Sequence, residues 1–204
     1  MYGANHEDIA YSYRTGNHGD GSWYSINGNI DYQRTSRKNK QRMITFSYKI
    51  NTQPQTSNSN TGYEDIHAKE EVDDLVKRLL LKNSQSDGKT NTMEQTFQVD
   101  YTTPIGELHT VEAGAKYIFR RNTSDNKLYE AAGGSDDYLY NEDRSSDYRH
   151  LNHILAAYLG YTLKYKDFTF KPGVRYEQTV QRVKYIVGPG AVSYTHLTLP
   201  TIRL

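Results

Sequence analysis

Few residues of this chain have the types and spacing that catalysis or metal binding requires. There are 7 histidines and no cysteines, so a thiolate metal site is excluded. His150 and His153 are three residues apart, which would place them on opposite faces of a strand. A loop-like segment gathers acidic residues that could bind calcium, but their spacing matches no EF-hand and an ordinary solvated loop explains them better: Asp136, Asp137, Glu142, Asp143 and Asp147. No nucleophile elbow, HExxH or P-loop motif occurs. The sequence predicts no enzyme, no metal site and no cofactor.

Alternating residues carry more information than these isolated groups. Phe97, Val99 and Tyr101 recur at every second position, and apolar residues do so again over 111–119. This spacing predicts two strands joined by a short turn that contains Pro and Gly. Similar alternation predicts four more strands, at about 23–33, 42–51, 152–165 and 168–180. Pro172 has no N–H group and is expected at a bulge or an unpaired position.

The predicted strands are joined by connections of alternating length. Segments of about 52–92 and 122–150 are polar and are predicted to be long loops. The first contains apolar residues at helical spacing, which predict a short amphipathic helix on the rim of the fold: Ile66, Val72, Leu75, Val76, Leu79 and Leu80. Short turns on one side and long loops on the other are typical of outer-membrane β-barrels, whose long loops face the outside of the cell.

Charge and composition agree with a membrane-spanning sheet. The net charge of +1 argues against a nucleic-acid partner, and no apolar run is long enough for a membrane helix. The apolar face is predicted to contact outer-membrane lipid and the other face to line a wet lumen. The predicted lumen-facing polar residues are Asp100, Glu112, Lys116, Arg120, Arg175 and Glu177. A soluble sheet with one solvated face is the alternative.

Tyrosine occurs 19 times in the chain. In an outer-membrane barrel, aromatic residues form girdles at the two interfaces. Four tyrosines lie instead in the second predicted loop and could stack on a sugar or siderophore ligand: Tyr129, Tyr138, Tyr140 and Tyr148. The alternative is that they pack this loop onto the rim.

Three segments, 27–49, 100–126 and 153–179, resemble the outer-membrane β-barrel family of Bacteroidetes that is related to TonB-dependent receptors. The stretch from Gly173 to Glu177 resembles a strand signature of such receptors. The resemblance implies an all-β, antiparallel up-and-down meander of about six long strands. This would be an open curved sheet with long extracellular loops, forming part of a transmembrane barrel. It also implies the bacterial outer membrane, nutrient uptake, a plug domain in the same full-length chain, and the TonB system as partner. A structural or adhesive barrel without transport is the alternative.

The last residues have a different character. Residues 192–201 match the translation of a sequencing adapter used in library preparation, and Ala191 is compatible with the adapter nucleotides just before them. We therefore expect 1–191 to be a segment of an outer-membrane barrel domain and 192–204 to be a non-native tail. The tail is expected to pack poorly and to continue no lipid-facing pattern.

Strand register can also be predicted. A tight turn at Lys166 and Asp167 would place Tyr165 opposite Phe168, and Tyr158 opposite Arg175. The hairpin of 97–121 allows two registers: Asp100 opposite Glu112, or Glu94 beside Lys116. Like charges directly opposite each other are unfavourable, so the second register is predicted.

Overall fold

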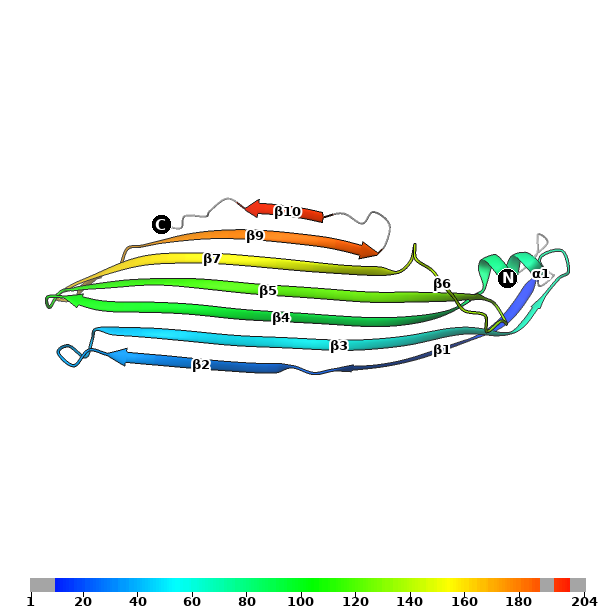
Figure 1. The fold of residues 1–204 in the computed structure, drawn as a ribbon, viewed down its shortest axis with the longest axis horizontal. Helices are drawn as coiled ribbons and strands as arrows, with labels where there is room; N and C mark the ends of the chain where they lie inside the picture. The colour runs from blue at the N-terminus through cyan, green and yellow to red at the C-terminus, as the bar shows by residue number, and fades with distance from the viewer. Residues whose placement is uncertain (1–9, 188–192, 199–204) are drawn as a thin grey trace.

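The computed structural model describes residues 10–187 and 193–198 as a single sheet with one short helical segment (Figure 1). The strands are β1 (Tyr11–Trp23), β2 (Ile26–Thr35), β3 (Met43–Ala68), β4 (Lys82–Ile105), β5 (His109–Ala132), β6 (Leu139–Tyr140), β7 (Ser146–Tyr165), β8 (Phe168–Phe170), β9 (Gly173–Val187) and β10 (Ser193–Thr198). The helical segment is α1 (Asp73–Leu75), which continues as a π-helical turn over Val76–Leu80.

The described strands form an antiparallel meander in the order β1-β3-β4-β5-β7-β9-β10. β1 and β2 pair with successive parts of β3, and β8 and β9 with successive parts of β7, so each pair follows the path of one interrupted strand. The sheet is not closed within the described residues, because β1 and β2 form one edge and β10 the other. The predicted fold class, an open part of an antiparallel barrel with six long strands, is confirmed.

The two interruptions occur at or opposite prolines. Pro54 of β3 lies opposite the gap between β1 and β2, where its carbonyl accepts a hydrogen bond from the Tyr24 N–H at 3.3 Å. Pro54 has no N–H to return, so the ladder is broken there. Pro172 lies between β8 and β9, and only its carbonyl joins the ladder, by accepting from the Tyr161 N–H at 2.9 Å. The expectation that Pro172 sits at an unpaired position is confirmed.

The registers agree with prediction in one hairpin and not in the other. Tyr165 lies opposite Phe168 and Tyr158 opposite Arg175, as expected. Both registers considered for the β4–β5 hairpin are wrong, because Asp100 lies opposite Gly114 and Glu94 opposite Arg120. This register also avoids the like-charge pair of Asp100 and Glu112, and it places Glu94 opposite Arg120 instead of Lys116.

The predicted bounds of the long loops are also wrong. β3 continues to Ala68 and β4 begins at Lys82, so only 69–81 connect them. β5 likewise continues to Ala132, and β7 begins at Ser146. The polar sequence of these strand ends is typical of a loop. Their backbone nevertheless pairs with neighbouring strands on both sides over most of the polar stretch, and this pairing satisfies the backbone hydrogen bonds without an apolar face.

The predicted helix is shorter than its apolar pattern suggested. Ile66 belongs to β3, and among the six residues of that pattern only Val76 is buried, with 1% of its surface exposed. Leu75, Leu79 and Leu80 are exposed. The helical segment lies within the β3–β4 connection, at the end of the sheet where β3 ends and β4 begins (Figure 1).

The sheet is one layer thick and has no conventional core. Among the described residues, the buried hydrophobic side chains are Val76, Leu81, Ala131 and Ala156. Large apolar side chains such as Phe46, Phe97 and Leu155 are each about half exposed (48%, 47% and 51%). A single sheet with such a face is not stable in water, so this face requires another apolar phase or surface.

Candidate functional surfaces

One face of the sheet carries a continuous apolar band. We call it the Phe97 face, because strand pairing aligns Ile30, Tyr48, Phe97, Tyr117 and Leu155 on it. The rings of Tyr48 and Phe97 are 4.8 Å apart, and an apolar hollow of about 470 Å³ lies over this row. On β5 the band runs from Val111 to Phe119, close to the roughly 9–11 residues that a tilted strand needs to cross a bilayer.

The opposite face, the Lys116 face, carries all six predicted polar residues. The pairing places Glu112, Lys116 and Arg120 on this face of β5. Asp100 lies on the same face of β4, and Arg175 and Glu177 on that of β9. The six residues therefore share one face, opposite the apolar band; that this face lines a lumen stays a prediction.

Several of these charges are held by short contacts along and between strands. Arg120 Nε donates to Glu94 Oε2 at 2.8 Å, and Arg175 Nη2 to Glu177 Oε2 at 2.8 Å. Lys171 Nζ lies 3.2 Å from Glu112 Oε2. Within the described part of the chain, Lys116 has no ion-pair partner. These contacts hold several of the charged side chains in place, whereas Lys116, between Glu112 and Arg120 on this face of β5, is available to another partner.

Tyr158 was not predicted as part of this face, yet its side chain contacts residues of β4 and β5 near the middle of the face. Its ring lies over Gly114, where an added Cβ would meet the ring carbons at 2.5 Å. Its hydroxyl donates to Asp100 Oδ1. The alternation of β7 could have placed Tyr158 on this face, but only the cross-strand pairing brings it onto Gly114 and Asp100.

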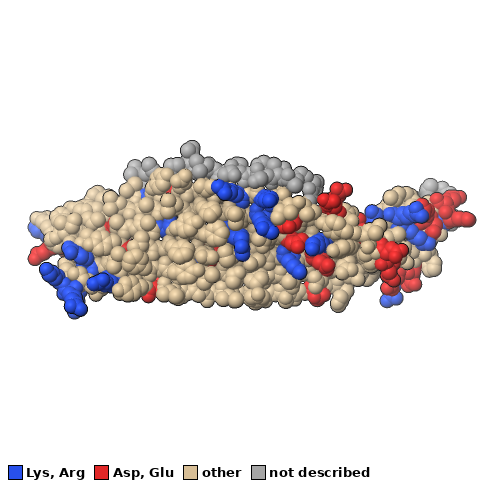
Figure 2. Space-filling view, in the orientation of Figure 1, with Lys and Arg blue, Asp and Glu red and all other residues tan. Residues whose placement is uncertain are grey.

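Beyond the apolar band the strands continue with polar side chains on both faces. β3 has 26 residues and β4 and β5 have 24 each. At about 3.3 Å per residue such strands are about 80 Å long, whereas a barrel's apolar band is about 25 Å tall. Figure 2 shows basic side chains at the tip of the half that holds β2, few charges over the rest of that half, and mixed charges from the middle towards the β1 end. The polar part of the sheet is therefore a second surface, which we call the strand extension.

The four predicted ligand-contacting tyrosines lie in or near this extension but do not come together. The rings of Tyr129 and Tyr140 pack 5.6 Å apart, whereas Tyr148 packs on Tyr185 at 5.9 Å. Strand pairing puts Tyr129 on the Phe97 face and Tyr148 on the Lys116 face. Tyr138 lines a hollow of about 440 Å³. Ligand contact by these tyrosines stays a prediction.

Two polar hollows lie side by side on the Phe97 face of the extension. The larger, of about 580 Å³, is lined by Asp20, Asp87, Lys127 and Tyr129, and the smaller by Tyr138 and Glu64. His18 and Asn60 line both hollows and so join them.

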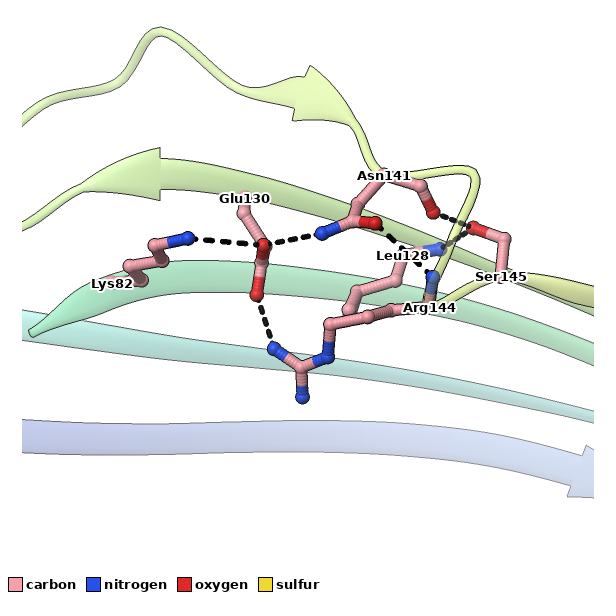
Figure 3. A network of polar contacts seen from close by, with 6 residues as sticks. All are labelled: Lys82, Leu128, Glu130, Asn141, Arg144 and Ser145. Atoms are coloured by element: carbon pink, nitrogen blue, oxygen red, sulfur yellow. Dashed lines mark hydrogen bonds and ion pairs between the residues drawn. The ribbon is translucent and has the colours of Figure 1, made fainter. Parts of the chain in front are cut away.

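A polar cluster around Glu130 fixes the connection between β5 and β7 (Figure 3). Asn141 Nδ2 donates to Glu130 Oε2 at 2.6 Å, Lys82 Nζ lies 3.6 Å from the same oxygen, and Arg144 pairs with Oε1. Ser145, which is 2% exposed, donates to the Asn141 carbonyl at 2.6 Å and accepts from the Leu128 N–H at 3.0 Å.

These contacts set the charge of Glu130. Burial raises the pKa of its carboxyl, but the Asn141 hydrogen bond and the positive charges of Lys82 and Arg144 outweigh it, so the pKa is lowered. Glu130 is therefore a charged anchor for the connection at neutral pH.

Neither a metal site nor a membrane-spanning helix is seen in the described residues. No group of three or more His, Asp or Glu side chains is placed to hold a metal ion over 10–187. Over the same part of the chain, no helix has the length and apolarity needed to cross a membrane.

Comparison with known proteins gives the family. The profile of the outer membrane protein beta-barrel family matches residues 34–197, which is most of the chain. The chain belongs to this family and is a protein of the bacterial outer membrane. No curated protein matches it.

One solved structure with a similar arrangement is that of the ferric citrate transporter FecA in its unliganded form. It aligns with a TM-score of 0.37 and 17% sequence identity, over 79% of this chain and 24% of FecA. The chain thus spans about a quarter of that transporter's length.

Proposed function

We propose that this chain is a segment of a large, plugged outer-membrane barrel that takes up nutrients in the manner of TonB-dependent receptors. The observation that supports this best is an open sheet with a charged Lys116 face. The sheet of six long strands and β10 has two unpaired edges within the described residues, so more strands are needed to complete a barrel. Transporter barrels with a plugged lumen have about 22 strands.

The Lys116 face suits a polar plug. In small barrels the interior is filled by the barrel's own side chains, whereas a large barrel can enclose a separate domain. Lys116 offers a hydrogen-bond donor to such a domain. The Glu94–Arg120 and Arg175–Glu177 ion pairs offer further donors and acceptors, because their side chains are between 34% and 45% exposed. We infer that they hydrogen-bond the plug.

A second candidate is a structural or adhesive barrel without transport. The strand extension favours it, because it presents polar groups and tyrosines on both faces well beyond the apolar band. Such a surface can bind a partner outside the cell whether or not a lumen conducts a nutrient.

The genomic DNA around this segment separates the two candidates. For a transporter we expect an upstream open frame that encodes a signal peptide, a TonB-contacting segment, a plug domain and further strands. A frame that closes directly behind a signal peptide, with no plug, would contradict the transporter and favour the structural barrel.

A further inference from the structure

Five exposed basic residues gather where the apolar band ends on the Phe97 face. They come from four neighbouring strands, and we call them the basic belt: Lys89 of β4, Arg121 of β5, Arg149 of β7, and Arg182 and Lys184 of β9. Arg121 and Arg182 flank Leu151 in one cross-strand row, and Arg149 lies beside Lys184 in the next. The row of Phe119 and His153 lies only two residues closer to the membrane band.

Part of this belt surrounds a hollow in the surface. A hollow of about 550 Å³ is lined by Lys89, Arg121 and Arg149, together with the polar side chains of Asn91 and Thr123. Two carboxylates, Asp125 and Asp147, also line it, on the side away from the band. Asp125 has a cation of its own, because Lys127 Nζ lies 3.8 Å from it.

The basic belt differs from other cations of the sheet in its partners. Arg120, Arg144, Lys171 and Arg175 each lie within 4 Å of a carboxylate. Within the described part of the chain, no belt residue forms an ion pair. A group of exposed, unpaired cations repels itself unless an anion from outside lies among them.

We propose that the basic belt binds the phosphate groups of a lipid headgroup in the outer leaflet of the outer membrane. Guanidinium groups bind phosphate oxygens in a two-pronged geometry, and basic clusters beside an apolar surface attract anionic lipids. The belt lies directly next to the band that contacts acyl chains, so one lipid can satisfy both. The long connections 69–81 and 133–145 are at this end of the sheet, which makes this the outer leaflet.

This proposal does not depend on transport, because it needs only a barrel in the outer membrane. The ligand is a lipid and not free phosphate, since a free anion makes no contact with the adjacent apolar band. The acyl chains would lie over the hollow of Phe97, Tyr117 and Leu155, on the same face.

The test compares lipid bound by the whole protein as it is made in the outer membrane. After mild detergent extraction, bound lipid is quantified by mass spectrometry, and binding is measured in nanodiscs of neutral lipid with added lipid A or dephosphorylated lipid A. We expect R121Q/R149Q to bind phosphorylated lipid A more weakly by about fivefold for each basic residue removed. We expect R121K/R149K to retain most of the affinity, since the charges remain.

The matched control is R37Q/K38Q, which removes two cations from the β2–β3 turn at the other end of the band and should change nothing. Heat-modifiable mobility on gels checks that each variant is a folded barrel. If R121Q/R149Q does not assemble, K89Q/K184Q at the rim of the belt takes its place. Equal retention by wild type and a folded belt variant would overturn the proposal. Equal binding of dephosphorylated lipid, or displacement of the lipid by inorganic phosphate alone, would also overturn it.

Discussion

Glu130 shows how a single carboxylate can hold a long connection in place. Its side chain is 9% exposed, and it contacts Lys82 of β4 and two residues of the 133–145 connection. Hydrogen bonds to charged groups contribute about 1.5–3 kcal/mol each. Because the charge of Glu130 holds two residues of the connection, we expect its removal to destabilise the whole connection and not one residue alone.

We expect Glu130→Gln to loosen the connection without unfolding the sheet. Amide hydrogen exchange over 133–145 should become about tenfold faster at neutral pH, which corresponds to a loss of about 1.4 kcal/mol. The control is Glu142→Gln, an exposed acid in the same connection whose side chain forms no ion pair within the described residues. Unchanged exchange in Glu130→Gln would show that the cluster does not anchor the connection.

The lowered pKa of Glu130 gives this contribution a pH dependence. A carboxyl with a lowered pKa in the folded state stabilises that state fully above its unfolded pKa, which is near 4.5. The contribution is lost as the pH falls through the lower folded value. The protection factors over 133–145, which are corrected for the intrinsic pH dependence of amide exchange, should therefore fall below about pH 4.5 in the wild type and much less in Glu130→Gln.

Gly114 and Tyr158 make a second local test, on the Lys116 face. A side chain at 114 would collide with the Tyr158 ring, so we expect Gly114→Val to reduce the amount of folded barrel in outer membranes. The control is Ala113→Val, which lies on the apolar Phe97 face beside Leu159. Heat-modifiable mobility on gels measures the folded fraction, and similar amounts of both variants would contradict the close packing of Tyr158 on Gly114.

At the scale of elements, the strand extension is the main difference from the predicted loops. Residues 55–61 of β3 lie between β1 and β4 and pair with both, although their sequence contains only Gln, Thr, Ser and Asn. Pairing on both sides supplies the hydrogen bonds that make so polar a segment extended and ordered.

This arrangement predicts slow hydrogen exchange over 55–61, by at least tenfold relative to the turn at 36–42 in the same protein. The turn is a suitable internal control because it is equally polar but pairs with no neighbouring strand on either side. Exchange at the same rate in both segments would mean that 55–61 is a loop, as its composition alone suggests.

At the scale of the whole molecule, the apolar band determines how the sheet is placed in a membrane. Because the described segment has no cysteine, single cysteines can be introduced at neighbouring positions of β4 and labelled with a fluorophore. A label at Val99 should be quenched strongly by brominated lipid, whereas a label at Gln98 should not, because the two side chains point to opposite faces. Equal quenching at the two positions would contradict a lipid-facing Phe97 face.

The end of the chain also bears on the whole molecule. Residues 193–198 form β10, whose backbone pairs with β9, and the family match reaches residue 197. Residues 192 and 199–204 lie outside the described residues, so the adapter origin of 192–204 stays a prediction. Amplification of the source locus should give a different sequence after Ala191, and recovery of the same codons from intact genomic DNA would show that the tail is native.

The sequence by itself determined the strand type, the two faces and the membrane setting. Alternation has a period of two and is a local property, so Phe97, Lys116 and Arg175 could be assigned to faces without any coordinates. Tertiary structure decided where strands end and which residues meet. The lengths of β3 to β5, the Glu94–Arg120 pair, Tyr158 on Gly114 and the basic belt all depend on cross-strand register, which is set jointly by several chain segments. A polar residue such as Thr56 or Lys89 is compatible with loop and strand alike, and only the hydrogen bonds of its neighbours decide between them.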